Sequence, residues 1–282
     1  MRQYENHNLE NNELPFIYKP GKVRSVNRMF AASNWHENVE ILYFTEGRGV
    51  LFDNGRVMSV VKGDVAVINA NHLHALAGDG EPLCYRYLIV DRAFCLANGF
   101  DSTALSYQPK INDPALLALM SDLNAAYEMP DGSAYKTLTA RTLVLRIMLL
   151  LCTGYSQSAA VDDRRERSTA YVKKAIDYIR ASYANDLSLD EVAAFAGINK
   201  CYLSREFHKY TGYPFVAYVN RTRCQQAARL LLDGHLSVHE IGKLCGFENR
   251  SYFTKSFRRY MGSTPNEYRA SVANQAEERK PK

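Results

Sequence analysis

Residues 246–269 read GFENRSYFTKSFRRYMGSTPNEYR, and their pattern occurs once more, 49 to 51 residues earlier in the chain. In this copy Ser237 opens a short helical segment, Gly246 marks a turn, and Phe253 and Phe257 follow four residues apart. Self-similarity at a fixed offset predicts that one supersecondary unit is built twice. The matching positions are Ser188, Glu191, Gly197, Leu203, Phe207, Gly212 and Pro214 in the first copy and Ser237, Glu240, Gly246, Phe253, Phe257, Gly262 and Pro265 in the second.

Each copy predicts two helices that cross at a turn. Residues four apart share a helix face, so Leu203 with Phe207, and Phe253 with Phe257, are expected to dock the second helix on the first. The opposite faces are polar and basic, as in a helix-turn-helix that enters the major groove of DNA. The alternative is a helical bundle whose basic faces are merely solvated, and the duplication argues against it. The polar faces carry Lys200, Ser204, Arg205 and Lys209 in the first copy and Arg250, Ser251, Thr254, Lys255, Arg258 and Arg259 in the second.

The net charge of +5 is distributed unevenly along the 282 residues. Residues 1–164 carry 15 Lys and Arg against 18 Asp and Glu, which gives −3, whereas residues 165–282 carry 20 against 12, which gives +8. This asymmetry predicts a polyanion-binding part at the C-terminal side, although a basic solvated surface would give the same count. We expect one domain over 1–155, an exposed polar linker over 156–168 (SQSAAVDDRRERS), and a second domain over 169–282.

The N-terminal half predicts an antiparallel β-barrel or sandwich followed by two helices. Between residues 23 and 90, short β-branched and aromatic segments alternate with Gly, Asn and Asp, and Asp53-Asn54-Gly55 is typical of a tight hairpin. Asp113-Pro114 predicts the start of a helix that runs to about Tyr127. A second helix is expected over about 133–155, and it is apolar nearly all round. It must therefore bury against the barrel, a partner subunit, or both.

Polar side chains within the barrel segment resemble the two cupin motifs. His36, Glu40 and Gly47 match the first motif, and His74 matches the second, while Asn34 stands where the first motif begins with another histidine. His36, Glu40 and His74 are able to bind a divalent metal, to recognise a polar ligand, or to hydrogen-bond within the barrel. We expect the second role and no metal, cofactor or catalytic residue.

Arg86 is the fourth expected effector-binding residue. Strand alternation turns every second side chain to the same face, so Arg86 is expected to point into the barrel together with Cys84 and Leu88. With the three cupin-like residues it would bind a polar metabolite such as a sugar or a small acid. The alternative is a reversed face, with Arg86 paired to a surface carboxylate and Tyr85 and Tyr87 pointing inward.

The duplicated segment, together with SREFHKYTGYPFVAYVNRTRCQQAARLLL over 204–232, resembles the AraC/XylS family of transcription regulators. The resemblance covers residues 170–270 specifically and 20–155 more weakly. It implies a multidomain α+β protein with a cupin-like effector-binding and dimerisation domain and an all-α domain holding two helix-turn-helix units. The chain departs from the family at Gly242, where Ala is usual, and at Cys201, where some members place a larger base-contacting side chain. The DNA-binding residues expected are Lys200, Cys201, Ser204, Arg205, Arg250, Ser251, Thr254 and Lys255.

The function implied by the resemblance is a ligand-responsive transcriptional regulator and not an enzyme. Its expected partners are promoter or operator DNA, a small-molecule effector, RNA polymerase and a second copy of the chain. Two alternatives are a cupin-type metalloenzyme with an accessory nucleic-acid-binding domain and a constitutive architectural DNA binder. A cytoplasmic location is expected, because the apolar run 143–152 is short of the roughly 20 residues of a membrane span, no secretory signal is evident, and the six cysteines are scattered.

Overall fold

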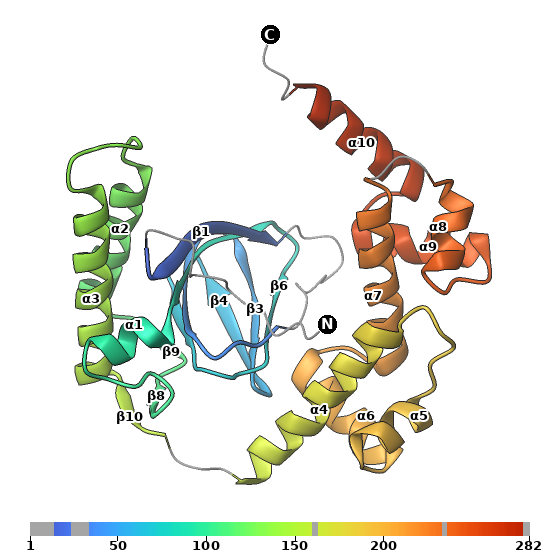
Figure 1. The fold of residues 1–282 in the computed structure, drawn as a ribbon, viewed down its shortest axis with the longest axis horizontal. Helices are drawn as coiled ribbons and strands as arrows, with labels where there is room; N and C mark the ends of the chain where they lie inside the picture. The colour runs from blue at the N-terminus through green and yellow to red at the C-terminus, as the bar shows by residue number, and fades with distance from the viewer. Residues whose placement is uncertain (1–13, 24–33, 160–162, 233–235, 279–282) are drawn as a thin grey trace. The chain divides into compact units, whose positions relative to one another are not determined.

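The computed structural model describes residues 14–23, 34–159, 163–232 and 236–278. The chain divides into two compact units, and the boundary falls between Asp163 and Arg164 (Figure 1). The N-terminal unit is rich in β-structure and the C-terminal unit is helical. This confirms the expected multidomain α+β class.

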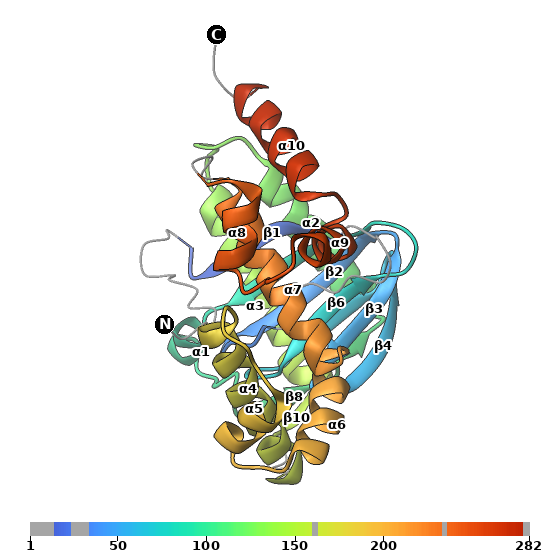
Figure 2. The ribbon, with the colours of Figure 1, turned by 90° about the vertical axis from the view of Figure 1, so that its right-hand side faces the viewer.

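The N-terminal unit is built from antiparallel strands in two facing sheets and a short ribbon. The sheets have the orders β1-β7-β2-β5-β9 and β4-β3-β6, and the ribbon is β10-β8. The strands curve around a common interior, as Figure 1 shows for β1, β3, β4 and β6, and Figure 2 shows β2, β6, β3 and β4 side by side. They are β1 (Phe16–Val23), β2 (Val39–Glu46), β3 (Arg48–Asp53), β4 (Arg56–Val61), β5 (Val65–Ile68), β6 (His74–Gly78), β7 (Leu83–Val90), β8 (Leu105–Tyr107), β9 (Lys110–Ile111) and β10 (Ser156–Ser158).

Strand β2 separates two apolar cores because its side chains alternate between the faces of the sheet. Val39 and Ile41 lie in the core that the larger sheet shares with the helices. Leu42 and Phe44 lie in the core between the two sheets, which is the barrel interior. Glu40 belongs to the same alternate row as Leu42 and Phe44, so its carboxylate enters the barrel interior at the start of that row.

The hairpin expected at Asp53-Asn54-Gly55 is present between β3 and β4. Asn54 and Gly55 have φ values of 47° and 80°, which is the left-handed geometry that a two-residue hairpin turn requires. Asp53 is buried and its Oδ1 lies 2.7 Å from Nδ1 of His72. The turn is thereby tied to the segment that leads into β6.

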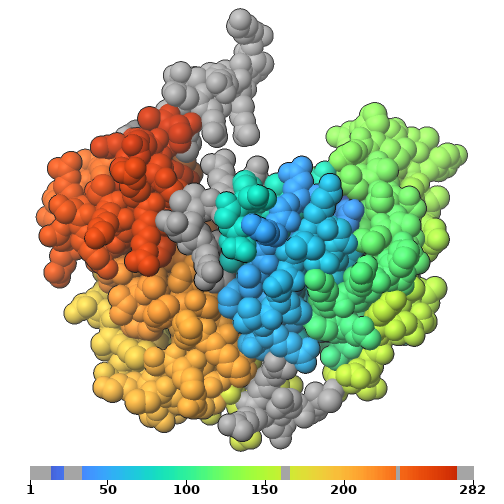
Figure 3. Space-filling view, turned by 180° about the vertical axis from the view of Figure 1, so that it is seen from behind, coloured from blue at the N-terminus to red at the C-terminus, as the bar shows by residue number. Residues whose placement is uncertain are grey.

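Helices α1 (Arg92–Ala97), α2 (Pro114–Glu128) and α3 (Lys136–Gly154) complete the unit, and α2 lies beside α3 (Figure 1). The amide of Ala115 donates to Oδ1 of Asp113 at 2.7 Å, so the predicted N-cap is confirmed. Helix α3 begins at Lys136, three residues after the expected start. In Figure 3 the barrel strands (blue) and the α2 and α3 region (green) form one continuous surface.

Helix α3 is long and apolar enough to cross a membrane by length and composition. Six of its side chains nevertheless pack in the core between helices and sheet, as in the core helix of a folded domain. The opposite face keeps large apolar side chains in solvent, since Leu138 is 61% exposed and Leu149 is 64% exposed. The buried residues are Ala140, Leu143, Val144, Ile147, Met148 and Leu151.

The stretch 156–168, expected as an exposed linker, is largely built into structure. Residues 156–158 form β10 and pair with β8, and helix α4 (Asp163–Ser182) includes the end of the stretch. Ser168 is buried, and its hydroxyl lies 2.7 Å from the hydroxyl of Tyr202. A polar composition therefore did not mean an unstructured segment here, and residues 160–162 lie outside the described residues.

The C-terminal unit contains the repeated pair of helices predicted from the sequence. In each copy a serine caps the first helix, since Ser188 Oγ accepts from Glu191 N and Ser237 Oγ accepts from Glu240 N. Asn199 and Asn249 cap the second helices in the same way. The helices are α4, α5 (Leu189–Ala196), α6 (Lys200–Thr211), α7 (Phe215–Leu230), α8 (Val238–Leu244), α9 (Arg250–Met261) and α10 (Pro265–Glu278).

The docking residues predicted for each copy are buried. Leu203, Phe207 and Phe257 have no exposed surface, and Phe253 is 1% exposed. Phe253 lies against Gly242 of α8, where an added Cβ would sit 2.9 Å from its Cδ1. Glycine at a position where the family usually has alanine is thus explained by the bulk of the facing ring.

Candidate nucleic-acid interface and effector site

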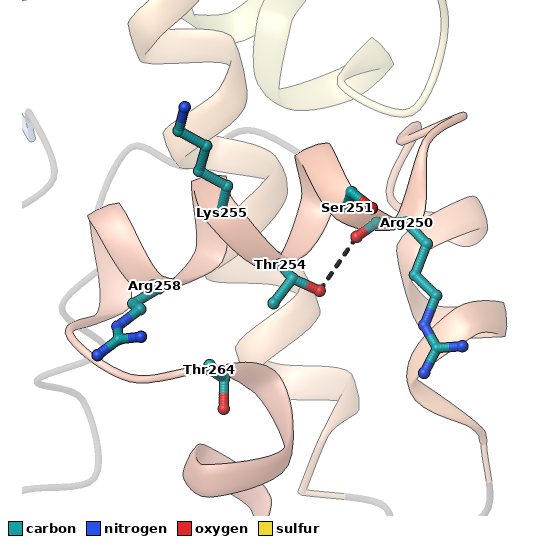
Figure 4. Close-up of a pocket in the computed structure, with 6 residues that line it drawn as sticks. All are labelled: Arg250, Ser251, Thr254, Lys255, Arg258 and Thr264. Atoms are coloured by element: carbon teal, nitrogen blue, oxygen red, sulfur yellow. Dashed lines mark hydrogen bonds between the residues drawn. The ribbon is translucent and has the colours of Figure 1, made fainter.

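Helix α9 presents a basic groove on its solvent face. The groove has a volume of about 660 Å³ and combines three cations with three hydroxyl groups (Figure 4). None of the residues that line it is acidic, although hydrogen bonds with Thr264 and the nearby Arg258 lower the pKa of the Glu267 carboxyl. Such a surface suits the phosphates and base edges of DNA. Its lining residues are Arg250, Ser251, Thr254, Lys255, Arg258 and Thr264.

Helix α6 presents the equivalent face in the first copy, but its cations have acidic neighbours. Lys200 Nζ lies 3.0 Å from Asp190 Oδ1, and Arg205 Nε lies 3.4 Å from Glu206 Oε1. The Arg205 guanidinium also lies over the ring of Tyr202, 5.4 Å from its centroid. All eight predicted DNA-binding residues are on α6 or α9, and Thr254 is partly buried while the other seven are exposed. The two faces therefore differ in charge although they share one geometry.

A tyrosine ties each of these two helices to the helix that precedes its helix-turn-helix unit, which is α4 for α6 and α7 for α9. The hydroxyl of Tyr202 lies 2.7 Å from Ser168 of α4, and the hydroxyl of Tyr252 accepts a hydrogen bond from Asn220 Nδ2 of α7 at 2.8 Å. The sequence interpretation missed this feature, although Tyr202 and Tyr252 occupy equivalent repeat positions. Ser168 and Asn220 are buried, so each bond ties a recognition helix to a fixed point and helps to set how α6 and α9 present their polar faces.

Thr264 is a second residue that the sequence interpretation missed. Its amide donates to Glu267 Oε2 at 2.8 Å, and its Oγ1 accepts from Glu267 N at 3.3 Å, which closes a capping box at the start of α10. The Thr-x-x-Glu pattern at 264–267 was the available signal. The capping box places the threonine at the edge of the α9 groove (Figure 4).

His36, Glu40 and His74 meet in the barrel unit as predicted. Glu40 Oε2 lies 3.1 Å from Nε2 of His36 and 3.1 Å from Nε2 of His74. Burial by itself opposes charge on these groups, but the hydrogen bonds from both rings hold the pKa of the Glu40 carboxyl well below its usual range. The same contact raises the pKa of His74 to about 9 in spite of its burial.

Arg86 does not point into the barrel, so that part of the sequence prediction is wrong. Its NH2 group lies 2.8 Å from Glu128 Oε1 of α2, and its guanidinium lies 6.0 Å from the ring centroid of Tyr127. Tyr85 and Tyr87 instead pack against the core between the sheets. Leu88 and Val90 pack in the core that the larger sheet shares with the helices. Arg86 belongs to the same alternate row of β7, so its side chain also lies on the helix side of the sheet.

Each of the two units matches the model of a known family. Residues 23–144 match the family model of an AraC-like ligand binding domain, and residues 192–271 match that of a helix-turn-helix domain. The transcriptional activator AarP from Providencia stuartii is 33% identical over 103 residues, which are 36% of this chain and 76% of AarP. The regulatory protein PocR from Salmonella typhimurium is 40% identical over 101 residues, which are 36% of this chain and 33% of PocR.

Among solved structures, the C-terminal domain of AraT, a response regulator from Geobacillus stearothermophilus, is 35% identical to this chain. It covers 36% of this chain and 84% of its own length, with a TM-score of 0.35. A ligand-binding barrel joined to a duplicated helix-turn-helix defines a class of DNA-binding regulators. The chain belongs to the AraC family of transcriptional regulators. The cupin-type metalloenzyme alternative gains no support from these relatives.

Proposed function

We propose that the protein is a ligand-responsive transcription regulator whose helices α6 and α9 read two successive major grooves. The observation that carries this proposal is the duplicated polar face, which has the same asparagine cap and tyrosine anchor in both copies. Residues near the start of a recognition helix contact base edges, and residues further along contact phosphates. The base-contacting set is Ser204, Arg205, Arg250, Ser251, Thr254 and Lys255, with Lys200 and Cys201 at the helix start.

Arg258 and Thr264 are assigned to the DNA backbone. Arg258 is in the last turn of α9, and the Thr264 hydroxyl retains its proton for donation because it accepts from Glu267 N. Together they present a cation and a hydroxyl donor to one phosphate at the edge of the groove. Contacts of this kind position the protein and carry no sequence information.

The barrel is assigned to effector binding. Glu40 and the two histidines supply polar contacts, while Leu42, Phe44 and the tyrosines of β7 supply apolar and aromatic surface. A sugar or a small acid fits this combination, because pockets of this kind are largely apolar with a few polar groups that fix orientation.

Dimerisation is assigned to the exposed face of α3, where Leu138 and Leu149 are the large apolar side chains in solvent. A cytoplasmic homodimer that contacts RNA polymerase at the promoter completes the proposed function. An effector alters DNA binding here insofar as it binds one conformation of the chain more tightly than the other.

Selection of binding sites from random DNA with the full chain tests the proposal. The selected site and a scrambled copy are then compared by mobility shift at one salt concentration, using the wild type, Arg250→Ala and Arg56→Ala. We expect the selected site to bind at least about 10³-fold more tightly than the scrambled copy. Arg250→Ala should lose about 1–3 kcal/mol, whereas Arg56→Ala removes an equal charge from β4 and should bind as the wild type does. Equal affinity for both DNAs would contradict the proposal.

A further inference from the structure

Helix α7 is shared by the two helix-turn-helix units and runs from one to the other (Figure 1). Near its start, the ring of Tyr218 packs against that of Phe207 on α6, with centroids 5.1 Å apart. Nearer its end, Cys224 and Ala228 lie in the core that also holds residues of α8 and α9. A single helix bends along its length, so a second contact is needed to fix the angle between the two units.

Arg223 makes such a contact from the middle of α7. Its Nε donates to the carbonyl oxygen of Tyr183 at 2.7 Å, and its NH2 group donates to that of Asn185 at 2.8 Å. Both oxygens belong to the segment that directly follows α4, where backbone carbonyls lack helical partners and the helix dipole favours a cation. Helix α4 is bonded to α6 through Ser168, so Arg223 ties α7 to the first unit.

The same guanidinium faces the turn of the second unit. It lies 5.7 Å from the ring centroid of Phe247, which is within the roughly 6 Å of a cation–π contact. Phe247 is in the turn between α8 and α9, and its ring packs on that of Phe253, with centroids 5.0 Å apart. Arg223 therefore joins the end of α4 to the turn that supports α9.

Gly246 shows that this turn also approaches the end of α4 directly. A Cβ at Gly246 would lie 2.6 Å from the carbonyl oxygen of Ala184. The matching glycine of the first copy, Gly197, has nearly the same φ, 79° against 82°, but no other described residue lies within 4 Å of its Cβ position. The turn conformation requires glycine in both copies, whereas the close approach is particular to the second. The inter-unit junction consists of residues 183–185, Arg223, Gly246 and Phe247.

We propose that Arg223 is a positioning residue that fixes the distance and angle between α6 and α9, and with them the spacing of the two DNA stretches that the protein accepts. The inference rests on the two-groove reading in the proposed function. Two helices held as one body fit stretches about one helical turn, roughly 10 base pairs, apart. One inserted base pair moves the second stretch by about 3.4 Å and rotates it by roughly 34°, so a rigid pair then engages one stretch and loses the other.

The test measures the affinity of the full chain for its selected DNA site and for copies with one base pair inserted or removed between the two stretches. The wild type should bind the altered copies at least about 10²-fold more weakly, since engaging both stretches at once contributes a factor of about 10² to 10⁴. Arg223→Met keeps an apolar stem but removes both donors. It should weaken binding to the selected spacing and reduce the ratio between spacings to less than about 10.

Two further variants separate the junction from charge. Arg223→Lys keeps a cation but not the planar pair of donors, so its ratio should lie between those of the wild type and Arg223→Met. Arg229→Met is the matched control, because it removes an exposed charge from the same helix. It should keep the wild-type ratio, since loss of charge by itself weakens binding to all spacings equally.

A wild-type ratio in Arg223→Met, or equal binding of all spacings by the wild type, would overturn the proposal. If circular dichroism shows that Arg223→Met does not fold, Arg223→Lys decides, and a wild-type ratio in that variant would overturn it. Failure of the proposed function gives a different result, because the wild type would then bind the selected site and a scrambled copy equally.

Discussion

Replacing Gly242 by alanine tests how the second helix-turn-helix is packed. The new Cβ would lie 2.9 Å from Phe253 Cδ1 and 3.3 Å from its Cγ. Carbon atoms in ordinary contact are about 3.5–4.0 Å apart, so the ring must move. Overpacking of this kind costs about 1–3 kcal/mol, and the better helix propensity of alanine returns about 1 kcal/mol. We expect Gly242→Ala to lower the free energy of unfolding by about 0–2 kcal/mol.

The first copy of the repeat supplies the compensating change. Ala193 and Leu203 occupy the positions of Gly242 and Phe253, and both are buried. In a Phe253→Leu background the overlap is removed, so Gly242→Ala should stabilise by about 1 kcal/mol. The double-mutant cycle should therefore give a coupling free energy of about 1–3 kcal/mol.

Denaturant unfolding of the full chain provides the assay with an internal control. Trp35 is the single tryptophan of the sequence and is buried in the N-terminal unit, so its fluorescence follows the barrel. Far-ultraviolet circular dichroism follows the helices. The dichroism transition should shift while the fluorescence transition stays. A coupling free energy below about 0.5 kcal/mol would refute the packing argument.

Three further variants test separate features of the structure. Tyr252→Phe removes the partner of Asn220 and should destabilise the C-terminal unit by about 0.5–1.5 kcal/mol in denaturant unfolding; an unchanged transition would mean that the bond does not anchor α9. Arg258→Ala should reduce the slope of log K against log salt by about 1 without altering base preference, and a changed preference would make Arg258 a base contact. Leu149→Glu should convert the expected dimer to a folded monomer in sedimentation, because Leu149 is 64% exposed, and a persisting dimer would exclude this face of α3.

The helical half of the chain was predictable because its signals are local. Serine and asparagine caps, turn glycines and apolar pairs four residues apart each act within one helix-turn-helix. Each of these signals occurs in both copies of the repeat, so one copy supports the interpretation of the other. The anchoring tyrosines were less accessible, since Tyr252 acquires its role from Asn220, which lies 32 residues away. A hydrogen bond between side chains on different helices is identified only once the packing of those helices is known.

The barrel was predictable in type but not in every side-chain direction. The convergence of His36, Glu40 and His74 was predicted from their cupin-like spacing, whereas Arg86 was assigned to the wrong face. Its strand carries large side chains on both faces, so alternation by itself does not identify the interior side. Arg86 lies on the face that α2 covers, where it pairs with Glu128, a residue 42 positions away in the sequence.

In the proposed function, two helices read two separate stretches of DNA. Base preference measured by site selection with the full-length wild type, Arg205→Ala and Arg250→Ala tests this most directly. We predict that each variant loses preference at one or two base pairs and that the two affected positions lie about one helical turn, roughly 10 base pairs, apart. Loss of preference at the same position in both variants, or uniform weakening on all sequences, would contradict it.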